Sequence, residues 1–229
     1  MTRPNGYTMW QGRSMLDGAR IMAVATGLSR PSENRKTGAM IQVWIMRSDM
    51  APHTAQKYGA DASICGACPL RSNGCYVTTV HAPLAVFREY ELGRYPSLSP
   101  AGVGHLSSKR GLPLRIGAYG DPAAVPMDVW SRATQAAQEW TGYTHFWRDY
   151  PGLRRWCMAS VESERDAKEA QALGWRTFRI RSQGATVLFG EQECLYSKAG
   201  VPCSACKLCN GAGLASSITI EGHGPLRKK

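Results

Sequence analysis

Strand-like and helix-like segments alternate over residues 113–190, and this order restricts the fold more than any other feature of the chain. The segments 39–48 and 113–120 are apolar and bounded by Gly, Pro or charge, which is typical of β-strands. Strands that alternate with helices pair in parallel, because a right-handed crossover returns the chain to the same sheet. The sequence therefore predicts an α/β fold that resembles a complete or partial (β/α) barrel. A doubly wound open sheet is the alternative. Weaker strand candidates lie at 20–27, 143–147, 156–161, 176–181, 185–190 and 216–222.

Two helices are predicted between these strands. The first begins at Pro126 and carries apolar residues at helical spacing as far as Trp140. The second begins after a capping Ser163 and ends at Gly174. The Gly- and Ser-rich segment 96–111 is instead expected to form a long mobile loop.

A chain of 229 residues is long enough for one α/β domain with a small appended unit. We expect a barrel-like catalytic domain at 1–190, with a cysteine-bearing insertion at 49–80, and a C-terminal metal-binding knuckle with the last strand at 191–229. No apolar run approaches the roughly 20 residues of a membrane span, and the first residues lack the apolar region of a secretory signal. The sequence therefore predicts a cytoplasmic protein without a membrane partner.

The chain is strongly basic. It has 28 Lys and Arg against 17 Asp and Glu, a formal net charge of +11. A field of that sign attracts polyanions, so nucleic acid is the partner that charge favours. A basic surface with no special ligand is the alternative.

The C-terminal cysteines have the spacing of a metal site. In a reducing compartment, C-x-x-C spacings indicate metal rather than disulfides. A tetrahedral site needs four donors, so zinc is favoured, with an iron–sulfur cluster as the alternative. His223 is an alternative fourth ligand in place of the first cysteine. The predicted ligands are Cys194, Cys203, Cys206 and Cys209.

A second group consists of Cys65, Cys68 and Cys75. Three thiols leave a fourth position for His53, His81, water or substrate. A site with an open position can do chemistry, whereas a closed one is structural. This second possible metal group therefore holds a structural zinc, a catalytic zinc or an iron–sulfur cluster with one free iron.

Two carboxylates follow predicted strands. Asp121 comes directly after the strand at 113–120, and Glu162 follows the strand at 156–161. Active sites of barrels and open sheets are built at this edge. Two carboxylates facing one pocket permit base exchange at a sugar C1′, where one attacks or stabilises the transition state and the other moves protons. The alternative is that Asp121 is a turn residue and Glu162 precedes a helix.

Aromatic and basic residues near these strand ends suit a nucleotide. Tyr119, Tyr143 and Trp147 are candidates for stacking on an extruded base. The loop 29–38 suits phosphates through charge and free backbone N–H groups. The remaining candidates for phosphate or carboxylate binding are Arg35, Lys36, Arg179 and Arg181.

Four motifs together carry a family resemblance: CGACPLRSNGCYV, RIGAYGDP, MASVES…GWRTFRI and CSACKLCNG…EGHG. They resemble phage-encoded DNA 7-deazaguanine transglycosylases, which look like reduced relatives of tRNA-guanine transglycosylase, a (β/α) barrel with a Cys/His zinc site. The resemblance covers roughly residues 20–223. It implies a zinc-containing DNA-guanine transglycosylase that replaces guanine in DNA with a free 7-deazaguanine (preQ-type) base in the cytoplasm of the host cell.

The chain departs from the tRNA enzymes in two motifs. Its thiols are spaced Cys-x2-Cys-x2-Cys rather than Cys-x-Cys-x2-Cys, and it lacks their Asp-Ser/Thr-Gly-Gly-Phe-Gln signature. The assignment of Asp121 as the reacting group therefore depends on its position and chemistry. Two other functions stay open: an iron–sulfur enzyme with radical chemistry on a nucleic acid or a nucleobase precursor, and a non-catalytic zinc protein that binds nucleic acid.

Overall fold

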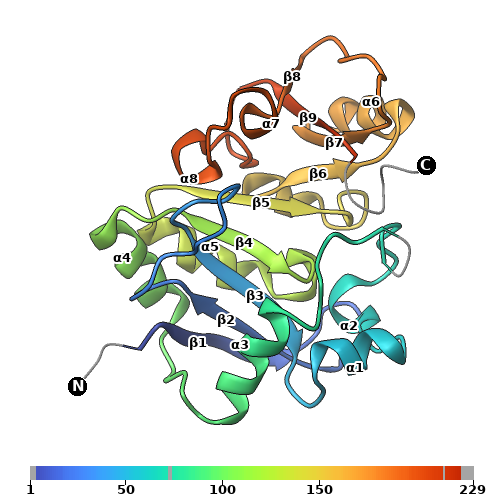
Figure 1. The fold of residues 1–229 in the computed structure, drawn as a ribbon. Coiled ribbons are helices and arrows are strands. Elements are labelled where there is room, and N and C mark those ends of the chain that lie inside the picture. The colour runs from blue at the N-terminus through green and yellow to red at the C-terminus, as the bar shows by residue number, and fades with distance from the viewer. Residues whose placement is uncertain (1–3, 72–73, 214, 223–229) are drawn as a thin grey trace.

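One mostly parallel sheet organises the molecule (Figure 1). The computed structural model describes residues 4–71, 74–213 and 215–222. Within these ranges nine strands form a single sheet in the order β1-β2-β3-β4-β5-β6-β7-β9-β8. The pairs β1–β2 and β2–β3 are antiparallel, and every other pair is parallel. The prediction of a mixed α/β fold is confirmed.

The nine strands have the following bounds: β1 (Gly6–Arg13), β2 (Arg20–Thr26), β3 (Ile41–Arg47), β4 (Leu114–Tyr119), β5 (Trp140–Thr144), β6 (Met158–Val161), β7 (Thr177–Arg181), β8 (Glu191–Glu193) and β9 (Ser217–Glu221). From β3 to β7 their order in the sheet follows their order in the chain. A doubly wound sheet reverses its strand order at a switch point, and no reversal occurs over this part of the described sheet.

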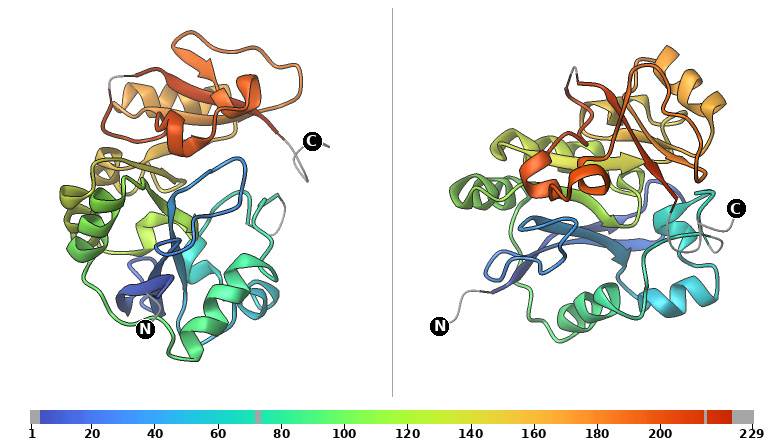
Figure 2. Two further views of the ribbon diagram at one scale, coloured as in Figure 1. Left: turned by 60° about the vertical axis from the view of Figure 1, so that its left-hand side comes forward. Right: turned by 45° about the horizontal axis from the view of Figure 1, so that its top comes forward.

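The α-helices are α1 (Pro52–Lys57), α2 (Ala62–Cys65), α3 (Ala82–Glu91), α4 (Pro100–Arg110), α5 (Met127–Ala136), α6 (Glu164–Ala172), α7 (Leu195–Ala199) and α8 (Cys203–Cys206). Two short 3-10 helices are η1 (Pro122–Ala124) and η2 (Pro151–Arg155). Helices α4 and α5 lie on one side of β2 and β3, and α1 to α3 lie on the other (Figure 2). A side chain at Gly104 would come within 2.1 Å of the Ala133 carbonyl oxygen, so a glycine is needed where α4 crosses α5.

The apolar core is centred on β2 and β3. Every residue from Ile21 to Thr26 is buried, because the strand is covered on both faces. Trp130 of α5 is fully buried and donates its indole N–H to the Pro122 carbonyl oxygen at 3.0 Å. This contact fastens α5 to η1, directly beside the end of β4. In the described residues, none of the helices has the length and apolar character that crossing a membrane requires.

The two strongest strand predictions are confirmed as β3 and β4, and five of the six weaker ones overlap β2, β5, β6, β7 and β9. The prediction at 185–190 is wrong, since this segment is a loop and β8 begins at Glu191. The predicted first helix ends at Ala136 rather than Trp140. Ala137 has an extended ψ of 142°, and Trp140 pairs with Leu114 as the first residue of β5.

The prediction of a mobile loop at 96–111 is also wrong, because residues 100–110 form α4. The Ser99 side chain accepts a hydrogen bond from the Gly102 N–H, Pro100 occupies the first turn, and Gly111 ends the helix with a φ of 63°. These are strong start and stop signals. They outweigh the low helix propensity of the Gly and Ser residues inside.

Candidate functional site

Three polar residues follow neighbouring strands at the carboxyl edge of the sheet. Asp121 follows β4, His145 follows β5 and Glu162 follows β6, and these neighbouring strands are parallel. Their carboxyl ends therefore lie side by side. The structure brings the two predicted carboxylates together through a histidine that the sequence reasoning missed.

Asp121 is buried, with 7% of its surface exposed. Its Oδ1 accepts hydrogen bonds from the Ala123 N–H at 2.9 Å and the Thr144 hydroxyl at 2.7 Å. Its Oδ2 accepts from the His145 backbone N–H at 2.8 Å. Burial raises the pKa of Asp121, and the hydrogen bonds oppose that rise. The carboxylate therefore ties the end of β5 to the start of η1.

The turn that carries Asp121 requires a glycine before it. Gly120 has a φ of 77°, and a side chain there would come within 2.7 Å of the Ile45 carbonyl oxygen. Both restrictions favour glycine, which has no Cβ. The glycine of the Gly-Asp-Pro motif therefore permits the turn that directs the Asp121 carboxylate toward β5.

His145 connects the cysteine-bearing insertion to Glu162. Its Nδ1 lies 3.4 Å from the Cys68 Sγ, and its Nε2 lies 2.9 Å from the Glu162 Oε1. Burial disfavours the charged imidazole, but the hydrogen bonds to Cys68 and Glu162 outweigh it and raise the pKa of His145 to about 10. This shift favours the imidazolium, the form of the ring that can donate a proton. The same strand-end argument that selected Asp121 and Glu162 applies to His145, which directly follows β5.

The Cys65, Cys68 and Cys75 group lies next to this edge. Burial raises the pKa of Cys65 well above its usual range, and Cys68 and Asp121 add to the effect. The Tyr119 hydroxyl is buried and has no hydrogen-bond partner among the described residues. Burial raises the pKa of Tyr119, and the nearby Cys65 adds to it. Tyr119 therefore lies beside the cysteines.

Two histidines were predicted as possible fourth partners of this cysteine group. His53 and His81 are both exposed, and the Thr54 hydroxyl lies 3.3 Å from the His53 Nε2. The histidine that does contact the group is His145, through Cys68.

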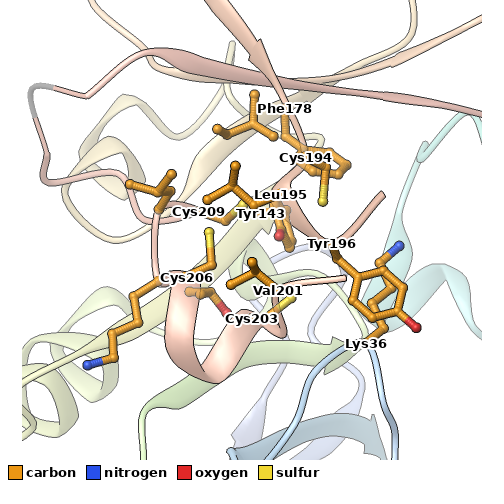
Figure 3. A pocket seen from close by; sticks show the side chains of 14 residues that line it. Lys36, Tyr143, Phe178, Cys194, Leu195, Tyr196, Val201, Cys203, Cys206 and Cys209 are labelled. Atoms are coloured by element: carbon orange, nitrogen blue, oxygen red, sulfur yellow. The ribbon is translucent and has the colours of Figure 1, made fainter. Parts of the chain in front are cut away.

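The four C-terminal cysteines line one small cavity of about 30 Å³ (Figure 3). Lys36 and Tyr143 line it as well. Burial raises the pKa of Cys209 to about 12, while a hydrogen bond from Tyr143 opposes the rise. His223, the alternative ligand, lies outside the described residues.

The cysteine side chains do not lie close enough together in the structure to form a metal site. Over the residues that the structure describes, no three His, Cys, Asp or Glu side chains are gathered closely enough to hold a metal ion. The chemistry of four thiols around one cavity still fits zinc, whose structural sites are commonly built from Cys alone.

Backbone contacts hold the C-terminal cysteine segment against the sheet. The Cys203 N–H donates to the Lys36 carbonyl oxygen at 2.9 Å, and the Gly142 N–H of β5 donates to the Cys209 carbonyl oxygen at 2.9 Å. The Arg176 guanidinium donates to the carbonyl oxygens of Leu208, Asn210, Ala215 and Ser216. The loop 29–38 thus supports this segment, and Arg35 on it is exposed.

Arg179 and Arg181 are engaged inside the protein. Arg179 is 3% exposed and forms two hydrogen bonds of 2.7 Å with the Glu191 carboxylate. Arg181 is 7% exposed and pairs with Glu193 and Glu221. Both guanidinium groups, which we expected to bind phosphate or carboxylate, bind carboxylates of the protein itself and hold the strands β7, β8 and β9 together.

The stacking candidates are largely covered. Trp147 is 2% exposed, and the Arg148 guanidinium lies 3.8 Å from its ring centroid. Tyr143 packs against Phe178 with 4.6 Å between ring centroids. Neither ring therefore has an exposed face beside Glu162 on which a base could stack.

Comparison of the chain with protein-family models, with curated proteins and with solved structures finds no match.

Proposed function

We propose that this protein exchanges guanine in DNA for a free 7-deazaguanine (preQ-type) base by attack at C1′, without ATP. The observation that carries the proposal is the contact of the His145 ring with a carboxylate at the carboxyl edge of the sheet. The Glu162 Oε1 lies 2.9 Å from the His145 Nε2, and Asp121 accepts a hydrogen bond from the His145 backbone N–H at 2.8 Å. Displacement of a base at C1′ needs a group that attacks the sugar carbon and an acid that protonates the departing base. A carboxylate next to a protonated imidazole can supply both.

We assign attack to Glu162, whose side chain is 30% exposed. Its carboxylate forms a bond to C1′ as the bond from C1′ to guanine N9 breaks, and His145 gives its proton to the departing base. The incoming base then returns a proton to His145 as its N9 bonds to C1′ and Glu162 is released. Asp121, our first choice from the sequence, is better suited to fix His145, because both of its oxygens already accept hydrogen bonds.

DNA and the free base are the proposed partners. The net charge of +11 favours a polyanion, and the exposed Arg35 lies on the loop that supports the C-terminal cysteines. We also propose that the sheet is a partial (β/α) barrel. The chain order of β3 to β7 supports this, as does the gathering of Asp121, His145 and Glu162 at the carboxyl edge, where barrels place their active sites.

Zinc is the metal we propose for Cys194, Cys203, Cys206 and Cys209, where it would fasten the C-terminal segment to β5. Purified protein is expected to carry about one zinc ion in this site. Replacing Cys206 with Ser should lower the metal content by about one ion per chain, whereas replacing the buried Cys157 with Ser should leave it unchanged. The measurement is zinc, iron and sulfide per chain together with visible absorbance. Brown protein with iron and sulfide would contradict zinc and favour the iron–sulfur enzyme.

The function is tested by incubating the protein with guanine-containing DNA and labelled 7-aminomethyl- or 7-cyano-7-deazaguanine. Label should enter intact DNA, and one guanine should be released for each base incorporated. DNA binding without incorporation, in protein that carries its metal, would contradict base exchange and favour the non-catalytic nucleic-acid-binding protein.

A further inference from the structure

Arg115 is a partly buried arginine without a carboxylate partner. It lies on β4, between Gln42 of β3 and Thr141 of β5. Its guanidinium donates to the Tyr76 hydroxyl at 2.7 Å and to the Gln42 Oε1 at 3.4 Å, and both acceptors are uncharged at neutral pH. Over the residues that the structure describes, no Asp or Glu forms an ion pair with it. A charge partly withdrawn from water is costly to leave without a counter-charge.

A second cation lies next to the same part of the sheet. Lys36 and Thr141 line the cavity that holds the four C-terminal cysteines, and Thr141 is the cross-strand neighbour of Arg115. The Cys203 N–H donates to the Lys36 carbonyl oxygen at 2.9 Å, which fixes Lys36 beside this cysteine (Figure 3). Lys36 likewise forms no ion pair with a carboxylate of the described residues.

Both positive charges act on the cysteines. Burial raises the pKa of Cys203, and Arg115 and Lys36 oppose the rise because they stabilise its thiolate. Lys207 lines the same cavity, but its amino group lies 3.7 Å from the Glu139 carboxylate, which balances its charge. Arg115 and Lys36 are therefore cations beside this cavity that still lack a negative partner in the described part of the chain.

We propose that Arg115 and Lys36 are the counter-charges of a zinc ion bound by four thiolates. This inference rests on the proposed zinc. The ion carries two positive charges and the thiolates carry four negative ones, so the loaded site has a net charge of about −2. Two neighbouring cations balance that charge. The balance matters more here than in water, because the lower dielectric of a partly buried site strengthens each interaction. Groups around metal ligands tune metal affinity in this way.

The charge balance also selects the fourth ligand. With the neutral imidazole of His223 in place of the Cys194 thiolate, the loaded site would carry a net charge of only about −1. Two cations match the set of four cysteines better. Cys194→Ser should therefore weaken zinc binding strongly, whereas His223→Ala should leave it unchanged. A loss with His223→Ala and none with Cys194→Ser would contradict the match of charges.

The test is the zinc affinity of the full chain, measured by competition with a chromophoric chelator. Arg115→Gln and Lys36→Gln should each weaken zinc binding about tenfold or more. Arg115→Lys keeps the charge and should stay within about threefold of the wild type. Arg13→Gln is the matched control, because Arg13 is an exposed arginine on β1, and it should leave the affinity unchanged. The absorbance of bound Co²⁺ reports whether four thiolates still coordinate in each variant.

Thermal unfolding separates a counter-charge from a structural role. Arg115→Gln should lower the unfolding temperature of the zinc-loaded protein but not that of protein freed of metal with EDTA, because only the loaded site has negative charge to balance. Equal losses with and without zinc would overturn the proposal and assign Arg115 to its contacts with Tyr76 and Gln42. Unchanged zinc affinity in Arg115→Gln or Lys36→Gln would overturn it as well, while leaving the zinc site in place. A wild-type chain that binds no zinc would remove both the site and its counter-charges.

Discussion

Replacing Glu162 with Gln is expected to lower the rate of base incorporation by about a thousandfold or more, because the amide neither attacks C1′ nor stabilises the imidazolium beside it. The Glu162 carboxylate lies 2.9 Å from the His145 Nε2 and is the more exposed of the two carboxylates at this edge. The measurement is label incorporated into DNA under single-turnover conditions. Glu164→Gln is the matched control, because Glu164 is an exposed carboxylate at the start of α6, two residues away.

The same substitution is expected to lower the pKa of His145 from about 10, since Glu162 is one of the two groups that raise it. Titration of the imidazole by NMR in metal-free protein measures this separately from activity. DNA affinity should be retained, because the substitution removes no positive charge. Incorporation at the wild-type rate by Glu162→Gln would remove Glu162 from the reaction. A lower pKa without loss of activity would show that the contact with His145 is only structural.

The sequence predicted the two carboxylates of the site but not the histidine between the strand ends that carry them. Asp121 and Glu162 could be placed because each follows an apolar strand, and parallel strands end at one edge. His145 follows a strand in the same way. It was missed because the predicted strand 143–147 ran through it, whereas β5 ends at Thr144. An error of three residues at a strand end was therefore enough to hide the residue that joins the two carboxylates.

The buried arginines show a different limit. Alternation in RTFRIR predicted that one face of the strand is polar, and Arg179 and Arg181 do share a face of β7. Their partners are Glu191, Glu193 and Glu221, which belong to β8 and β9. Strand β9 lies between β7 and β8 in the sheet, and this order places glutamates of both strands within reach of the β7 arginines. The spacing of residues along the chain carries no record of that strand order, so the sequence predicted phosphate or carboxylate partners without identifying these glutamates.

Replacing Arg179 with Met is expected to lower the free energy of unfolding by about 3–5 kcal/mol, because it leaves a buried carboxylate without its counter-ion. The Glu191 side chain in this pair is 0% exposed, and Arg179 is 3% exposed. Urea unfolding followed by tryptophan fluorescence measures the change. Arg132→Met is the control, because its partner Asp128 is exposed and the pair lies along one helix. Such a pair contributes less than about 1 kcal/mol.

The double variant Arg179→Met/Glu191→Leu separates the charge from the packing. If the loss in Arg179→Met comes from the uncompensated Glu191 charge, removing that charge should restore most of the stability. An equally unstable double variant would contradict this and assign the loss to the missing contact with the Thr186 carbonyl oxygen.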